Sequence, residues 1–332
     1  MSFRRGRRSI RVPPAVMRLG VRQLGRRCTD PALPWQVQRA RLDQFTRTSV
    51  LPPGTMIAGK VMGGVRAVVV SAPAPGPQRS PAPGPRRSPA PGPQRNPAPG
   101  PQRTVIHFHG GGYCVGSART ARSWAAHLSA QASCRVVLPE YRLAPEHPHP
   151  AALEDARAVI GALSAEAGPG TVVVSGDSAG GGLALALLLW MRDEGQDLPA
   201  GCIMLSPWLD LGRDRRAVPD LVREDVLLSP EWLDACASAY AGPDARAGPL
   251  VSPLRAAHYG LPPLLIQAGT SDLLAPDAEL LAASASAAGV DVTYTRWPRM
   301  WHDFALQPGL LAAADSALAQ AAWFVGKATD SR

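Results

Sequence analysis

Two glycine-rich motifs hold the residues of this sequence whose types and spacing could do chemistry. Residues 109–112 read His-Gly-Gly-Gly, and residues 176–180 read Gly-Asp-Ser-Ala-Gly. The first motif can offer backbone N–H groups to a developing oxyanion, and the second can present the hydroxyl of Ser178 as a nucleophile. Together they supply the two halves of an acyl-transfer site. The predicted oxyanion donors are the N–H groups of Gly110, Gly111 and Ala179.

Each motif begins where a short apolar run ends. The runs at residues 104–108 and 171–175 predict buried strands, and the Ala- and Leu-rich run at 179–191 predicts a buried helix after Ser178. A sharp turn between a strand and a helix lifts a serine above the sheet, and small neighbours permit the strain. A glycine-rich connection or a phosphate-binding turn is the alternative, but no Lys follows the glycines.

The elements that must position these motifs alternate along the chain between strand-like and helix-like segments. Strands are expected near residues 135–139, 171–175, 201–206, 263–268 and 290–297. Helices are expected near residues 120–132, 151–163, 179–194, 276–288 and 310–326. This alternation predicts an α/β fold with a mostly parallel, doubly wound sheet.

Two segments outside this alternation are expected to form a helical cap. Residues 207–260 break the pattern and predict an insertion over the carboxyl ends of the strands, joined there by residues 1–50. The core then comprises residues 51–206 and 261–332. The tryptophans expected near the rim of the site are Trp208, Trp232 and Trp301.

Residues 72–103 interrupt the core with a Pro-rich octad that occurs four times. Because alternating Pro removes backbone donors and the tract has little to bury, we expect it to be disordered and partly polyproline II. The runs on either side, residues 65–70 and 104–108, are expected to be neighbouring strands joined by this expanded hairpin loop. A neutral insertion is expected, and a docking segment for proline-recognition modules is the alternative.

The net charge of +9 is confined to two appendages. Residues 1–27 contain nine Arg and no acidic residue, and the Pro-rich tract adds five Arg, so the rest of the chain is acidic. Since neither appendage interleaves its Arg with aromatic residues, we expect no nucleic-acid partner.

The Arg-rich start does not resemble a secretory signal, because Pro13 and Pro14 interrupt it, so a cytoplasmic location is expected. Residues 15–27 predict a helix that we assign to the cap. The alternative is a basic amphipathic helix that makes weak, peripheral contact with an anionic membrane surface through residues 1–27. No apolar run approaches the length that spans a bilayer.

The metal-binding residue types are too scattered to predict a metal or cofactor site. Five cysteines without a Cys-x-x-Cys pair are expected to be reduced and mostly buried. His107 and His109 form a His-x-His pair, but no acidic or Cys partner stands at ligand spacing nearby. We therefore expect neither a metal nor a cofactor, and His109 is expected to anchor its loop.

Several motifs in the same order resemble the hormone-sensitive-lipase-like family of α/β-hydrolase esterases. The similarity runs from about Pro34 to Phe324, outside the Pro-rich tract, and lies in residues 109–113, 140–147, 176–180, 252–254 and 260–264. The resemblance implies an α/β-hydrolase fold and a Ser-Asp-His group in that chain order, with the acid and the histidine after two late strands.

Asp272 is the predicted acid, because it directly follows the apolar run at residues 263–269. Asp277 stands in the first turn of the next helix, where the helix dipole alone explains a carboxylate. Asp210 and Asp303 are weaker candidates for the acid.

His302 is the predicted base, because it is the only histidine that follows the acid in the chain. The family usually has a glycine after this histidine, where this chain has Asp303, and commonly has Asp where this chain has Glu140. We expect the first departure to alter the local loop but to leave the imidazole of His302 available.

These residues predict a serine carboxylesterase that hydrolyses short- to medium-chain acyl esters of small molecules through an acyl-enzyme. An amidase or N-deacetylase would use the same group, and a catalytically inactive hydrolase fold that binds a ligand is the third reading. Monomer and dimer both stay open.

Overall fold

The computed structural model describes residues 11–48, 50–74 and 103–330. Eight strands of these residues form one sheet in the order β1-β2-β4-β3-β5-β6-β7-β8. They are β1 (Met56–Met62), β2 (Val65–Ser71), β3 (Thr104–Phe108), β4 (Arg135–Pro139), β5 (Val172–Asp177), β6 (Gly201–Leu205), β7 (Leu264–Gly269) and β8 (Val292–Trp297). Strands β3 to β8 run parallel, and β2 is antiparallel to both of its neighbours. The predicted doubly wound, mostly parallel sheet is confirmed.

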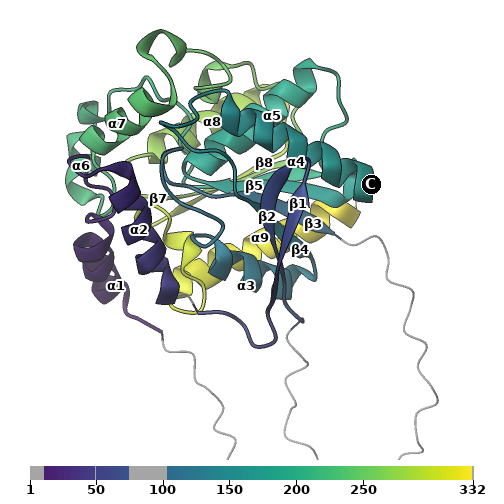
Figure 1. Ribbon diagram of the computed structural model, residues 1–332, viewed down its shortest axis with the longest axis horizontal. Coiled ribbons are helices and arrows are strands. Elements are labelled where there is room, and N and C mark those ends of the chain that lie inside the picture. The colour runs from purple at the N-terminus through teal and green to yellow at the C-terminus, as the bar shows by residue number, and fades with distance from the viewer. Residues whose placement is uncertain (1–10, 49, 75–102, 331–332) are drawn as a thin grey trace, which may run out of the picture.

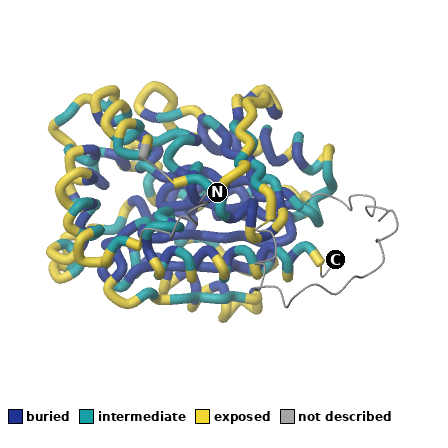
Figure 2. The backbone as a smooth tube through the Cα atoms, turned by 90° about the horizontal axis from the view of Figure 1, so that it is seen from below, coloured by how far each residue is buried: buried dark blue, intermediate teal, exposed yellow. Residues whose placement is uncertain are grey.

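Helices cover both faces of the sheet. They are α1 (Pro14–Gly20), α2 (Trp35–Phe45), α3 (Arg122–Ala132), α4 (Ala151–Ala167), α5 (Ala179–Asp193), α6 (Pro219–Glu224), α7 (Pro230–Tyr240), α8 (Ala275–Ala287) and α9 (Ala312–Asp330), and a π-helical turn, η1 (Val21–Gly25), continues α1. Helices α3 and α9 pack together on one face, and α4, α5 and α8 belong to the core on the other. The buried residues are concentrated in the middle of the molecule (Figure 2).

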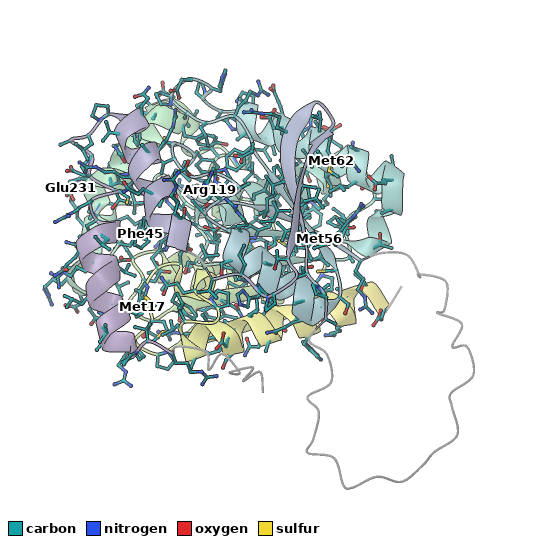
Figure 3. The ribbon with its side chains drawn as sticks, turned by 60° about the horizontal axis from the view of Figure 1, so that its bottom comes forward. Met17, Phe45, Met56, Met62, Arg119 and Glu231 are labelled. Atoms are coloured by element: carbon teal, nitrogen blue, oxygen red, sulfur yellow. The ribbon has the colours of Figure 1, made fainter. Side chains whose placement is uncertain are left out.

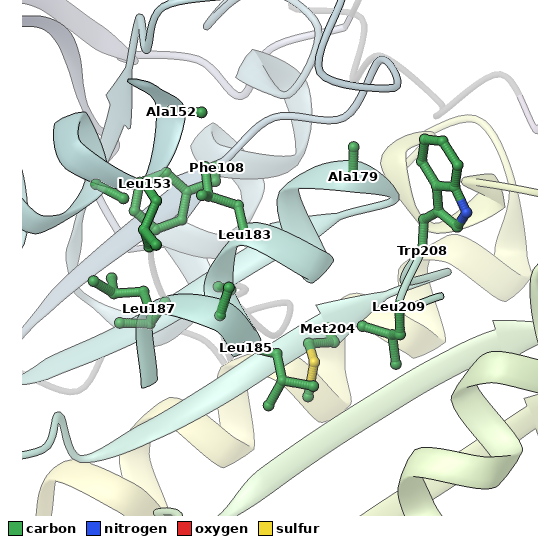
Figure 4. Packing of buried hydrophobic residues seen from close by; sticks show 14 of the residues in the cluster. Phe108, Ala152, Leu153, Ala179, Leu183, Leu185, Leu187, Met204, Trp208 and Leu209 are labelled. Atoms are coloured by element: carbon green, nitrogen blue, oxygen red, sulfur yellow. The ribbon is translucent and has the colours of Figure 1, made fainter. Parts of the chain in front are cut away.

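Helix α5 is the most deeply buried helix next to the strands. Every residue from Ala179 to Leu189 is buried, as its Ala- and Leu-rich sequence predicts. Leu183 and Leu187 on α5 gather with Phe108 of β3 and Leu153 of α4 in the core (Figure 4). The start of α5, which follows Ser178, is therefore held firmly against the sheet.

One expectation about the first strands was wrong, and one strand was missed. Strand β2 pairs with β4, so the runs at residues 65–70 and 104–108 are not neighbours, because α3 carries the chain from β3 across to β4 between them. Strand β1 was not predicted. Met56 and Met62 mark the two ends of β1 (Figure 3). Most of its residues are exposed at the edge of the sheet, so its sequence does not alternate between apolar and polar residues as that of a half-buried strand does. Most of the Pro-rich tract, residues 75–102, lies outside the described residues.

The N-terminal segment and residues 207–260 lie side by side. Helices α1, α2, α6 and α7 are grouped at one end of the molecule (Figure 1). The buried Trp232 Nε1 on α7 donates to Gln38 Oε1 on α2 at 2.8 Å, and Thr29 Oγ1 donates to the carbonyl of Leu227 at 2.8 Å. Within the described ranges no helix has the length and apolar character needed to cross a membrane.

Asp277 has a larger role than the helix dipole that we expected to explain it. It is fully buried at the start of α8, accepts from the backbone N–H groups of Leu209 and Asp210, and pairs through both oxygens with the buried Arg215 at 2.9 and 2.8 Å. Removing one partner of a buried pair typically costs about 3–5 kcal/mol. Asp277 therefore fastens the start of residues 207–260 to the core.

Candidate active site

Ser178 occupies the turn between β5 and α5. Its φ of +52° lies in the left-handed region, which residues with a side chain seldom adopt. A Cβ on Gly176 would lie 2.1 Å from the carbonyl oxygen of Gly180, and a Cβ on Gly180 would lie 1.9 Å from the carbonyl oxygen of Phe108. The turn thus closes only because neither glycine has a side chain, which explains why glycine stands at both positions of the motif.

The loop after β3 brings its glycines to the same place. Gly111 has a φ of +115°, and a Cβ there would lie 2.2 Å from the carbonyl oxygen of Val115. The N–H of Gly110 donates to Asp177 Oδ2 at 2.9 Å, so it is already engaged. The expectation that Gly110 offers a free donor is therefore wrong, because the carboxylate of Asp177 accepts the hydrogen bond of its N–H.

Other N–H groups of the two motifs remain open. Within the described residues, no hydrogen bond to a protein acceptor is found for the N–H of Gly111, Gly112 or Ala179. Gly111 belongs to the loop after β3, and Ala179 is the first residue of α5. A helix begins with N–H groups that have no partner in the helix, so Ala179 is well suited to meet a negative oxygen.

His107 and His109 both serve the loop after β3. His107 is buried, with Nε2 2.9 Å from Asp177 Oδ1 and Nδ1 3.0 Å from Ser175 Oγ. His109 Nδ1 donates to the carbonyl of Gly110 at 2.8 Å, and its ring stacks on Tyr141. Burial lowers the pKa of His109. Their hydrogen bonds thus explain the His-x-His pair without a metal, and among the described residues no group of three or more metal-ligating side chains gathers.

Asp272 lies in the loop after β7 and His302 in the loop after β8, and their side chains are in contact. His302 Nδ1 donates to Asp272 Oδ1 at 3.0 Å, and the N–H of Leu274 donates to the same oxygen at 2.9 Å. Both side chains are buried. Two of the three alternative acids are not placed in this way, because Asp277 pairs with Arg215 and Asp210 pairs with Arg255.

The other nitrogen of His302 faces a carboxylate too. Nε2 lies 3.2 Å from Asp303 Oδ2, so the expectation that Asp303 leaves the imidazole available does not hold at this nitrogen. Burial alone would lower the pKa of His302, but the carboxylates of Asp303 and Asp272 outweigh it and raise this pKa well above its ordinary value.

A carboxylate from residues 207–260 supports the loop that carries Asp272. Asp225 is buried, and its Oδ2 accepts from the N–H of Leu273 at 2.8 Å. Its Oδ1 accepts from the N–H groups of Leu227 and Leu228 at 2.8 and 2.9 Å. Burial, with the nearby charge of Asp272, raises the pKa of Asp225 to about 6. Sequence reasoning missed this residue, since nothing in its spacing connects it to the loop after β7.

Further contacts extend this support to the N-terminal segment. Ser271 Oγ donates to Glu224 Oε2 at 2.8 Å, and Arg26 Nη2 donates to the carbonyl of Asp225 at 2.8 Å. Three segments far apart in the sequence thus hold one another beside Asp272.

Both glycine-rich motifs and His302 lie against one cavity of about 260 Å³. Ser178, His302, Asp303 and the glycine loop form its polar wall. The rest of the lining is mostly apolar and includes Met17, Val21, Leu42, Phe45, Leu227, Leu228 and Trp232, together with the polar side chains of Thr29, Thr46, Thr120, Ser123 and Gln307. Figure 3 shows Met17 and Phe45 on the two neighbouring N-terminal helices. Of the three tryptophans expected near the rim, Trp232 lines the cavity, whereas Trp208 and Trp301 are buried in the core and do not line it.

The described residues place all five cysteines in buried positions without disulfides, as expected. Burial raises the pKa of Cys134 to about 12, so this thiol stays protonated.

Comparison with known proteins agrees with this fold. The family described as alpha/beta hydrolase fold matches residues 105–306. An esterase of Acinetobacter venetianus is 36% identical over 222 residues, which cover 66% of this chain and 73% of that protein. An acetyl-hydrolase of Streptomyces hygroscopicus is 41% identical over 201 residues, which cover 60% of this chain and 67% of that protein.

Solved structures extend the likeness to nearly the whole chain. The crystal structure of an esterase from the bacterial hormone-sensitive lipase family superposes with a TM-score of 0.81 at 31% identity, covering 96% of this chain and 100% of that one. A hormone-sensitive lipase from a metagenome library gives the same TM-score at 30% identity, covering 96% of this chain and 99% of that one. The chain therefore belongs to the hormone-sensitive-lipase-like family of α/β-hydrolase esterases and is a carboxylic ester hydrolase.

Proposed function

We propose that this protein is a serine carboxylesterase in which Ser178 is the nucleophile, His302 the general base and Asp272 the residue that orients His302. The observation that carries the proposal is the shared cavity, since Ser178, His302 and the glycine loop line one wall of it. Asp272 also supports the assignment, because its carboxylate accepts a hydrogen bond from Nδ1 of His302 and so orients the ring.

The roles follow from the positions of the protons. His302 Nε2 takes the proton of Ser178 Oγ as this oxygen bonds to the ester carbonyl carbon, and the resulting imidazolium then protonates the departing alcohol. Water repeats the sequence on the acyl-enzyme. The oxyanion is met by the N–H groups of Gly111 and Ala179, and by that of Gly112 in place of Gly110, whose N–H is engaged by Asp177.

The cavity favours short acyl chains within the predicted short- to medium-chain range. Its volume of about 260 Å³ lies below the roughly 300–1,000 Å³ of most ligand pockets, and its walls away from Ser178 are largely apolar. A relative at 41% identity is named acetyl-hydrolase, which supports a short acyl group.

Residues 11–50 and 207–260 are the cap of this site in our proposal. The first helix supports the cap assignment, because Met17 and Val21 face the cavity. The same helix and its π-helical continuation also expose Val16, Leu19 and Leu24, so contact with an anionic membrane surface stays a prediction that sedimentation with anionic vesicles would test.

The test of the proposed function replaces Ser178 by Ala. Loss of a serine nucleophile typically lowers kcat by about 10⁴–10⁶-fold, with the thermal midpoint nearly unchanged. The measurement is turnover on p-nitrophenyl esters graded by acyl length, with Ser316→Ala on α9 as a matched exposed control. An organophosphonate should label the wild type at Ser178 and leave Ser178→Ala unlabelled.

Two results would overturn the proposal. Turnover retained by Ser178→Ala would assign the nucleophile elsewhere. Anilide turnover equal to or faster than that of the matched ester would favour the amidase.

A further inference from the structure

Asp303 is held in an unusual position beside the proposed base. Its φ of +58° is in the left-handed region, and its backbone N–H donates to Ser206 Oγ at 3.2 Å. The fixed backbone turns the carboxylate toward the cavity, where Oδ2 meets His302 Nε2 at 3.2 Å. Within the described residues, Oδ1 is buried and has no hydrogen-bond partner. The imidazole is therefore the only side-chain partner that this carboxylate has there.

Within the described residues, three further carboxylates interact with this pair. Asp272, from the loop after β7, contacts the other nitrogen of His302. Asp225, from residues 207–260, interacts electrostatically with His302, and Asp177, at the end of β5, interacts with Asp303. Asp272 and Asp225 favour a proton on the ring of His302. Burial, with the nearby charge of Asp177, raises the pKa of Asp303 to about 7, although His302 opposes this shift.

We propose that Asp303 is a second anionic partner of the catalytic histidine, which holds a proton on Nε2 in the free enzyme and thereby makes ester hydrolysis depend on removal of that proton. This inference rests on the proposed function, because it requires His302 to be the base. Asp303 contacts the reacting nitrogen itself, so it acts directly on the proton-transfer step.

The proton balance explains both effects of such a partner. In the free enzyme Nε2–H donates to Asp303, and this proton must leave to solvent before Nε2 can accept one from Ser178 Oγ. When Oγ attacks, its proton arrives on Nε2, and the new imidazolium lies between Asp272 and Asp303. Asp303 therefore suppresses activity at low pH and strengthens the base at high pH.

The test compares pH profiles of kcat/KM for the wild type, Asp303→Asn and Asp303→Gly with p-nitrophenyl acetate. Both replacements suit a positive φ, and Asn keeps the size of the side chain while removing its charge. An adjacent opposite charge typically shifts a pKa by about 1–3 units, so the acid limb should move down by about one pH unit or more in both variants. The plateau should fall by about threefold, because base strength enters the rate only in part.

Asp291→Asn is the matched control for charge, since Asp291 is exposed and pairs with Lys327 far from the cavity. It should reproduce the wild-type profile. A purely structural role of Asp303 would lower the plateau without moving the acid limb, so acid limbs that coincide in all four proteins would overturn the proposal. Ser178→Ala is measured alongside: if it keeps turnover, the proposed function fails, whereas an inactive Ser178→Ala with unmoved acid limbs removes only the role of Asp303.

A second measurement covers the case in which the variants fail to fold. Nitrogen NMR of histidine-labelled wild type should show the ring of His302 doubly protonated near neutral pH. A neutral ring at that pH would overturn the proposal.

Discussion

The two sides of the proposed active site are held in place by different means. On the nucleophile side, the turn at Ser178 and the glycine loop are fixed by backbone packed against backbone, where a single added carbon would collide at Gly111 or Gly180. On the acid–base side, the loop with Asp272 is held by side-chain oxygens that reach it from residues 207–260. The nucleophile side is therefore part of the core. The geometry of the acid–base side depends on the position of the proposed cap.

Of the changes that test this contrast in support, the largest effect should come from Gly111 on the nucleophile side. Ala at this position places a Cβ 2.2 Å from the carbonyl of Val115 and disfavours the φ of +115°, so the peptide must rotate. Loss of one oxyanion donor typically lowers turnover by about 10²–10³-fold, which we expect for kcat.

Gly161→Ala is the matched control for this change. A Cβ there meets open space on α4, so activity should stay at the wild-type level. Near-normal kcat in Gly111→Ala would show that the glycine loop is less rigid than its packing indicates.

A smaller effect is expected from Asp225→Asn on the acid–base side. With Oδ1 still accepting from Leu227 and Leu228, the new Nδ2 would point a donor at the N–H of Leu273. An unmet buried group typically costs about 1–3 kcal/mol, and displacement of the loop should lower kcat/KM by about tenfold. Thermal unfolding and ester kinetics measure the two effects.

Asp220→Asn, at an exposed site on α6, is the control for Asp225→Asn and should behave as the wild type. If Asp225→Asn lowers the thermal midpoint but leaves kcat/KM intact, then the cap does not position the acid loop.

The smallest effect on activity should follow Gln38→Ala, which separates the two halves of the proposed cap. It removes the acceptor of the buried Trp232 Nε1, so unfolding should become easier by about 1–3 kcal/mol. Because Trp232 lines the cavity and its Nε1 donates to Gln38, not to the reacting groups, we expect KM to rise more than kcat falls. Gln36→Ala, exposed on the same helix, is the control, and equal stability of the two variants would contradict the prediction.

The same contrast explains what the sequence could predict. The strands and helices that carry Ser178, Asp272 and His302 were placed to within a few residues, because apolar runs and glycines encode them locally. Asp225 escaped prediction, since its partner in the acid loop, Leu273, lies 48 residues away in the chain and no periodic pattern connects the two. The hydrogen bond from Gly110 to Asp177 depends on side-chain direction in a loop, which residue types alone do not determine.

The pairing of the strands could not be predicted from local sequence patterns either. The runs at residues 65–70 and 104–108 are both apolar, but only the folded chain shows that β4 lies between them. Asp277 shows the converse: its place at a helix start was read correctly, while its buried partner Arg215 lay in a segment without a strand pattern.

The register of β2 and β3 has a practical consequence for handling this enzyme. Val70 pairs with Val136 and Thr104 with Arg135, so the chain leaves β2 and enters β3 at the amino ends of the parallel strands. Ser178 lies at the opposite end of β5. An affinity tag or a fluorescent domain spliced in after Ala74 would thus be attached on the side remote from catalysis, where it should leave esterase assays undisturbed.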